Sequence, residues 1–239
     1  MVEPNSLLLL LGAQPVSSLS HLIAAAAALV AAVPLVRLGQ GCRGRKLALT
    51  VYVSSVVITL AISGVYHGME PGSQGRYIMQ RVDHCAIWCL IAGTFTGVHG
   101  IMWRGFWRRG VLSFIWAYAA FGIVLQVLWF RAVVGNIELI LYLGLGWVGI
   151  FSIHKLGRQI GWAAALPMLY AGIAYSAGAI LEAYKWPVIV SHWVEAHEVF
   201  HFAVIVGVVL HWRFIRYLLI HHTSALAAPS PSPPVAVHV

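Results

Sequence analysis

Long apolar runs decide what this chain can fold into. A helix needs ~20 mostly apolar residues to cross the hydrocarbon core of a bilayer. Seven such runs lie at about residues 20–36, 47–68, 82–102, 111–130, 133–153, 162–182 and 193–212. Hydrophobic residues make up 60% of the chain and charged residues only 9%, more apolar surface than a water-soluble fold can bury. We therefore predict an all-α integral membrane protein, a bundle of seven transmembrane helices.

The predicted bundle is one domain, over residues 19–220, between two unlike ends. Residues 1–18 contain the short apolar run 7–11, which lacks the basic start of a secretory signal and is too short to span a membrane. Residues 221–239 are rich in Ala, Pro and Ser and are predicted to be a disordered tail. The three cysteines give no disulfide framework, and Cys85 and Cys89 are interpreted as small packing residues.

The basic residues predict how the bundle is oriented. The net charge of +8 does not indicate nucleic-acid binding, because the cations form short clusters between the apolar runs. With antiparallel helices, one membrane side receives eleven of them: Arg37, Arg43, Arg45, Lys46, Arg104, Arg108, Arg109, Lys155, Arg158, Arg213 and Arg216. The other side receives four: Arg76, Arg81, Arg131 and Lys185. Since Lys and Arg concentrate in cytoplasmic loops, we expect a cytoplasmic C-terminus in a plasma (inner) membrane.

Four ionisable residues lie where apolar side chains are expected. His67 ends the second run, Asp83 opens the third, and His197 and His201 begin the last. Ionisable groups in a membrane are energetically unfavourable and mark functional sites by default. Antiparallel threading brings all four to the same membrane face, so they are candidates for one common site.

The histidine spacing predicts a zinc site. His197 and His201 are four residues apart, which puts both imidazoles on one helix face. His67 would complete a three-histidine site with an open fourth position, as in catalytic zinc centres. Ser63 shares the face of His67. The alternative is that each histidine only hydrogen-bonds within the bundle, but the combination favours a metal, and three imidazoles favour zinc.

Other histidines are assigned lesser roles. His211 lies ten residues beyond His201, about 15 Å along the helix, which is too far to share the ion. His84 points about 100° away from Asp83 and is expected behind the ligands or at the interface. His21 either caps the site or lies at the membrane surface.

The segment 197–201 also matches H-E-x-x-H, in which the glutamate is the general base of a metalloprotease. Such enzymes take their third ligand from a later segment, yet no Asp or Glu follows Glu198 in this chain. The third ligand must therefore lie upstream. We interpret Glu198 as an accidental match or as a partner of an imidazole N–H.

Several segments together resemble the hemolysin III branch of the progestin and adipoQ receptor (PAQR) family. They are Gln14–His21, Ser63–His67, Arg81–Ile87, Leu90–Thr96, Ala174–Ile180 and the pair His197 and His201. The resemblance covers about residues 14–212. It implies a seven-helix bundle with zinc on the histidines, an aspartate (Asp83) beside the water that zinc holds, and a serine (Ser63) behind the ligands. Adiponectin-receptor-like members have the zinc on the cytoplasmic side, whereas the charge count here places it outside.

The resemblance implies a zinc-dependent hydrolase of amide-linked lipids, because the wider group includes the alkaline ceramidases. Zinc would polarise a carbonyl and activate water, and Asp83 would be the general base. The partner is then a membrane lipid, such as a sphingolipid or fatty-acyl amide, that enters between helices. The alternatives are a receptor or sensor with structural zinc, a hemolysin-like pore and an intramembrane metalloprotease. No polar stripe that would line a wide pore is visible.

Overall fold

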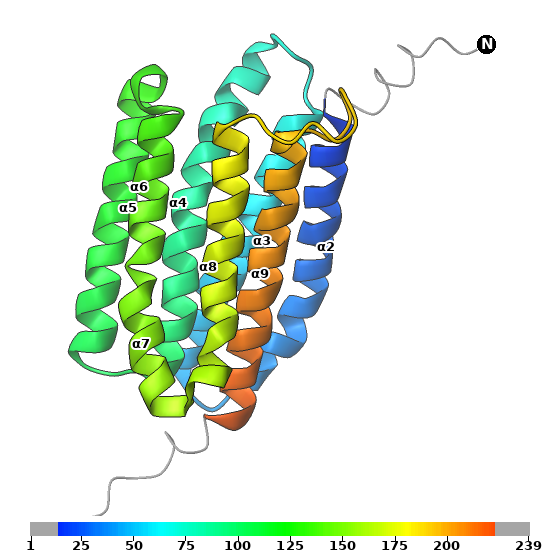
Figure 1. Cartoon of the computed structure of the whole chain (residues 1–239). Helices are drawn as coiled ribbons and strands as arrows, with labels where there is room; N and C mark the ends of the chain where they lie inside the picture. The colour runs from blue at the N-terminus through cyan, green and yellow to red at the C-terminus, as the bar shows by residue number, and fades with distance from the viewer. Residues whose placement is uncertain (1–13, 223–239) are drawn as a thin grey trace, which may run out of the picture.

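The computed structural model describes residues 14–222, which form a bundle of eight helices without a β-strand (Figure 1). The helices are α2 (Pro15–Leu38), α3 (Arg43–Gly68), α4 (Gln74–Met102), α5 (Phe106–Val133), α6 (Asn136–Trp147), α7 (Gly149–Ile160), α8 (Trp162–Ala183) and α9 (Ala196–His221). Most of the predicted N-terminal segment and of the predicted disordered tail, residues 1–13 and 223–239, lies outside the described residues.

The prediction of seven transmembrane helices is confirmed. In the described part of the chain, seven helical stretches are long and apolar enough to cross a membrane, with α6 and α7 together forming the fifth, Asn136–Ile160. Most helices extend a few residues beyond the predicted runs, because polar residues at the membrane surface continue the helical turn. In α4, for example, Ser73 caps the N-terminus by accepting a hydrogen bond from the backbone N–H of Arg76 at 3.2 Å. Asp83 therefore lies in the third turn of α4.

The fifth transmembrane stretch is interrupted, which the sequence analysis did not anticipate. Helix α6 ends at Trp147 and α7 begins at Gly149, in the middle of the bundle. Gly144, Gly146 and Gly149 surround the interruption, and glycine is a poor helix former in the interior of a helix. The indole N–H of Trp147 donates a hydrogen bond to Ser176 Oγ on α8 at 3.0 Å, which ties the interrupted region to its neighbour.

Small residues let α3 and α4 pack closely. A Cβ on Gly93 would lie 2.6 Å from Ser55 Cβ, and one on Gly97 would lie 3.1 Å from Tyr52 Cβ. Gly93 and Gly97 are four residues apart, a spacing of small residues that allows close helix approach. Helix α2 packs against α3 and α9, and α9 against α8, so the first and last helices are neighbours (Figure 1).

The two ends of the bundle differ in charge. Six described carboxylates lie at the end where α2, α4, α6 and α9 begin, the upper end in Figure 1: Glu70, Asp83, Glu138, Glu182, Glu195 and Glu198. The eleven clustered cations lie at the opposite end. Because all the carboxylates of residues 14–222 are at the first end, the basic end contains none of them. The predicted site is at the acidic end.

Candidate metal centre

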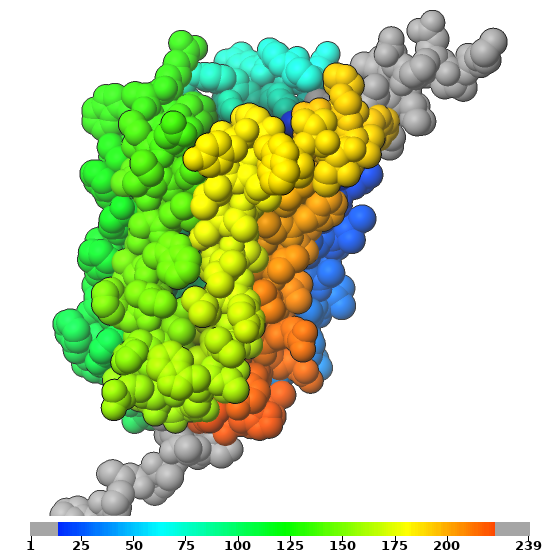
Figure 2. All heavy atoms as spheres, in the orientation of Figure 1, coloured from blue at the N-terminus to red at the C-terminus, as the bar shows by residue number. Residues whose placement is uncertain are grey.

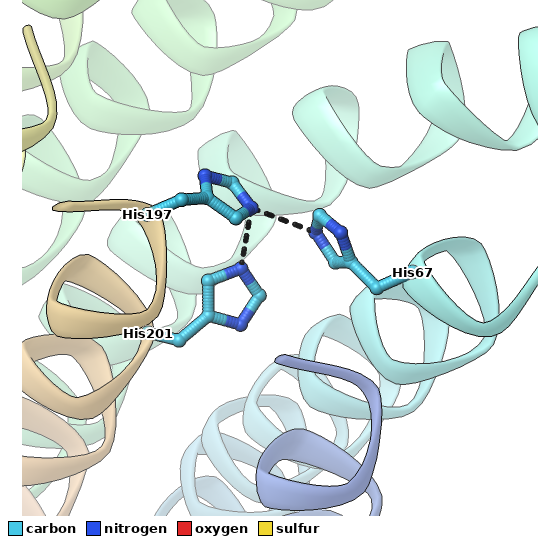
Figure 3. Close-up of side chains that lie close together, drawn as sticks. All are labelled: His67, His197 and His201. Carbon is cyan, nitrogen blue, oxygen red and sulfur yellow. Dashed lines mark hydrogen bonds between the residues drawn. The ribbon is translucent and has the colours of Figure 1, made fainter. Parts of the chain in front are cut away.

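Three histidines from two helices converge at the acidic end of the bundle (Figure 3). His67 lies in the last turn of α3, and His197 and His201 lie in the first two turns of α9. Their candidate ligand atoms all lie within 4.8 Å of one another. The Nε2 atom of His197 is 3.1 Å from Nε2 of His201 and 3.4 Å from Nε2 of His67. The convergence predicted from spacing is therefore present.

Gln14 fixes the orientation of His67. Its side-chain Oε1 accepts a hydrogen bond from His67 Nδ1 at 2.6 Å, and its backbone N–H donates to the His67 carbonyl at 3.1 Å. Arg76 holds the same Oε1 through Nη2 at 2.8 Å. With the proton on Nδ1, the His67 Nε2 presents a lone pair to the other imidazoles.

Glu182 has the corresponding role for His197. Its Oε1 lies 3.4 Å from His197 Nδ1, and a carboxylate can only accept, so the proton is on Nδ1. Lys185 Nζ contacts the same carboxylate oxygen at 2.5 Å. A carboxylate or amide behind a metal-ligating histidine sets its tautomer and increases its basicity. Sequence reasoning missed both Gln14 and Glu182.

The donor set fits a tetrahedral metal ion. Two Nε2 lone pairs that face each other repel unless a proton or cation lies between them. Zinc–nitrogen bonds of 2.0–2.1 Å in a tetrahedron put neighbouring nitrogens about 3.3 Å apart, close to the 3.1 and 3.4 Å of the two pairs that include His197. The ligand atoms of His67 and His201 lie within the 4.8 Å that bounds the whole set. Residues 67, 197 and 201 are therefore able to hold a metal.

His21 on α2 covers the third histidine. Its ring lies tilted by 35° against that of His201 with the centroids 3.9 Å apart, and its Nε2 is 3.4 Å from the His201 carbonyl oxygen. Both side chains are buried. Of the two roles left open for His21, the structure supports the cap. The Nδ1 atom of His201 is buried without a hydrogen-bond partner among the described residues.

Asp83 and Ser63 form a second polar pair beside the histidines. Both are buried, and the Ser63 hydroxyl hydrogen-bonds to the Asp83 carboxylate. One turn further into the membrane, Thr59 Oγ1 donates to the Ala86 carbonyl at 2.9 Å and holds α3 against α4. Asp83 and all three histidines line the same cavity. The structure thus brings all five predicted site residues together.

Glu198 is not a partner of an imidazole, so that part of its interpretation is wrong. Its Oε1 accepts a hydrogen bond from Ser17 Oγ at 2.9 Å, and its Oε2 accepts from the backbone N–H of Glu195 at 3.0 Å. Glu198 therefore closes the N-terminus of α9 and attaches it to α2. Because both oxygens are engaged, the geometry does not favour Glu198 as the base of a metalloprotease.

A buried polar network that the sequence analysis did not predict lies next to Asp83. Glu138 on α6 accepts hydrogen bonds from His84 Nδ1 at 2.6 Å, from Tyr142 at 2.7 Å, and from Gln126. Trp88 donates to Gln126 at 2.8 Å. The observed partner of His84 is thus Glu138, a carboxylate in the fifth predicted run that the sequence analysis did not single out.

One cavity of about 670 Å³ extends from the histidines into the bundle. Its polar residues are concentrated near the candidate metal centre, while Ile87, Leu90, Phe95 and Met168 are among its apolar walls. His211 lines this cavity too, but its Nδ1 bonds to the Gly207 carbonyl at 3.1 Å on its own helix. Such a space fits a long apolar ligand with one polar end near the histidines.

Comparison with known proteins assigns the chain to a family. Residues 12–212 match the family described as haemolysin-III related. The chain belongs to this family. Hemolysin-3 of Bacillus cereus is 30% identical over 141 residues, which cover 59% of this chain and 64% of that protein. A hemolysin-3 homolog of Bacillus subtilis (strain 168) is 27% identical over 158 residues, 66% of this chain and 70% of that protein. The haemolysin-III-related family belongs to the PAQR group, as the resemblance predicted.

Proposed function

We propose that this haemolysin-III-related protein is a zinc-dependent hydrolase of amide-linked membrane lipids. The observation that carries the proposal is the set of three Nε2 atoms, two of them with tautomers fixed by Gln14 and Glu182, that faces one cavity with Asp83. Zinc held there would polarise the scissile carbonyl and make water a stronger nucleophile.

Asp83 supplies the acid–base chemistry in this proposal. Its carboxylate takes the proton from the attacking water and later gives it to the nitrogen of the leaving amine, so that one amide and one water yield a carboxylic acid and an amine. Ser63 holds the carboxylate from the α3 side.

The substrate reaches the site from within the bilayer. The cavity is bounded by Gly146 and Trp147 at the end of α6 and by Gly172 and Ser176 on α8. The surface is hollowed between these helices (Figure 2). An acyl chain passing there would occupy the apolar part of the cavity and present its amide to the histidines.

The decisive experiment measures zinc content and turnover of ceramides and other N-acyl amides by the purified protein. Wild type should contain about one zinc and hydrolyse the lipid. Asp83→Asn should keep the metal and lose activity by at least about a hundredfold, whereas Glu198→Gln, a matched carboxylate change on α9, should remain active. Stoichiometric zinc without turnover of any acyl amide would contradict the proposal.

A second candidate is a receptor or sensor in which zinc is structural. It is favoured because the candidate centre joins several helices. Its ligands come from α3 and α9, whereas Gln14, which holds His67, precedes α2, and Glu182, which holds His197, lies in the last turn of α8. In that case removal of zinc lowers stability, but Asp83→Asn changes neither zinc content nor signalling. The relatives are named hemolysin-3, which suggests a pore as a further alternative. A pore would conduct ions across a membrane, and His67→Ala should leave that conductance unchanged.

A further inference from the structure

The basic end of the bundle contains a small pocket between α3, α4 and α5. Its volume is about 40 Å³, and its walls include Cys42, Arg45, Trp103, Arg104 and Arg108. Three of these five side chains are guanidinium groups. The pocket is at the opposite end of the bundle from the candidate metal centre, so it is independent of the proposed function.

Two of the arginines are positioned by the packing of the helices. Arg45 and Arg108 are only partly exposed, and a Cβ on Gly44 would lie 3.7 Å from Nη1 of Arg108. The wall beside them is held by Trp103, whose indole N–H donates to Gln159 Oε1 at 2.8 Å. Within residues 14–222, neither Arg45 nor Arg108 pairs with a carboxylate or hydrogen-bonds to another residue through its guanidinium.

The pocket favours negative charge. Cys42 lies just before α3, where a hydrogen bond from the backbone N–H of Arg45 holds the pKa of the thiol below its ordinary value. The charges of Arg45 and Arg104 act in the same direction. Because the described carboxylates are all at the other end, an anion for this pocket has to come from outside the described chain.

We propose that this pocket binds the phosphate of an anionic phospholipid, with Arg45 and Arg108 as its main contacts. The planar guanidinium fork matches phosphate oxygens in pairs, which ammonium groups do not. Basic pockets between transmembrane helices take anionic headgroups on the cytoplasmic side. The pocket lies where the candidate spans α3, α4 and α5 begin or end, so the acyl chains of a lipid held there can remain in the bilayer.

The test compares arginines that line the pocket with neighbours that do not. Delipidated full-length protein is titrated with phosphatidylglycerol or phosphatidylcholine, and retained lipid is counted by native mass spectrometry. Wild type should bind phosphatidylglycerol in preference. The double variant Arg45→Gln/Arg108→Gln should weaken that binding by about tenfold or more. The control Arg43→Gln/Arg109→Gln changes net charge equally on the same helices and should bind like wild type.

Three results would overturn the proposal: equal loss in both double variants, equal binding of the two lipids, or inorganic phosphate that binds as tightly as the lipid. The first would mean diffuse attraction to the whole basic end, and the last a site for free phosphate. Arg45→Lys/Arg108→Lys keeps the charge but not the fork. If it folds, as judged by unchanged gel filtration and melting temperature, it should still bind several-fold more weakly than wild type.

Discussion

Gln14 links the N-terminus of α2 to the candidate metal centre through a single side chain. It holds the Nδ1 proton of His67 and is itself held by Arg76. Outer partners of metal-ligating histidines typically contribute 10–100-fold to metal affinity. We therefore expect Gln14→Leu to weaken zinc binding by about tenfold to a hundredfold, measured by competition with a chelator of known affinity. Gln40→Leu, in the α2–α3 connection, is the control and should bind zinc like wild type.

The reactivity of the Cys42 thiol reports on the positive charge at the basic end of the bundle. Because its thiol pKa is lowered, the reactive thiolate persists at a lower pH than for an ordinary cysteine. The rate of alkylation by a charged, water-soluble reagent should therefore reach half of its plateau at a pH below that of a free thiol. Peptide mapping separates Cys42, which is exposed, from Cys85 and Cys89 in the membrane-spanning part of α4. A midpoint at or above the ordinary thiol value would contradict this assignment.

Residues that the sequence predicted and residues that it missed differ in one physical respect. His197 and His201 share a helix face through their spacing, and His67 shares their depth through antiparallel threading. Glu182 also has the right depth, in the last turn of α8. However, whether it faces the site depends on how α8 is rotated, and that rotation is set by contacts with α7 and α9, which one sequence does not display.

At the scale of elements, Glu138 joins three helices. Its carboxylate connects His84 on α4, Gln126 on α5 and Tyr142 on α6. Removing a partner from a buried charged network leaves the remaining polar groups unpaired in a medium without water. We expect Glu138→Leu to lower the free energy of unfolding by about 3 kcal/mol and the melting temperature by about 10 °C. Differential scanning fluorimetry in a mild detergent measures the change.

The matched control for this network is Glu70→Leu, which removes an exposed carboxylate at the same end of the bundle. Its melting temperature should stay within about 2 °C of wild type, since surface substitutions change stability little. A fall as small in Glu138→Leu as in the control would mean that the network does not stabilise the packing of α4, α5 and α6.

Helix boundaries and interruptions were less predictable than the helices themselves. Seven apolar runs suffice to identify the spans because lipid requires each of them to be helical. The interruption at Val148 lies inside a continuous apolar run, and its neighbour Trp147 bonds to Ser176 on another helix, a contact that the sequence alone does not reveal. The polar start of α4, before Asp83, was outside any apolar run and was therefore missed.

At the scale of the molecule, a larger side chain in the wall of the cavity should obstruct the entry of a lipid substrate. Gly172 on α8 lines the cavity, and a Cβ there would meet no atom within 4 Å. Gly172→Leu should therefore fold normally but obstruct the hollow between α6 and α8. We expect long-chain N-acyl amide hydrolysis to fall about tenfold or more, while Gly172→Ala, which adds one methyl group, keeps most of it. Unchanged activity in Gly172→Leu would place the lipid entrance elsewhere.

Metal removal gives a second measurement on the whole bundle. An ion that binds only the folded state adds to its stability in proportion to the logarithm of its concentration over its dissociation constant. Chelation should thus lower the melting temperature of wild type by several degrees, and re-addition of zinc should restore it. In His197→Ala, which has lost a ligand, the chelator should have no effect. A wild-type protein indifferent to the chelator would show that the three imidazoles hold no metal.

The packing of α2 against α9 has a consequence for how the protein is made. Ser17 bonds to Glu198, and His21 covers His201, so within residues 14–222 the first helix to be made meets the last one. The three imidazoles cannot come together until translation has passed residue 201. A metal that needs all three imidazoles would then be captured only after α2 to α8 have been made.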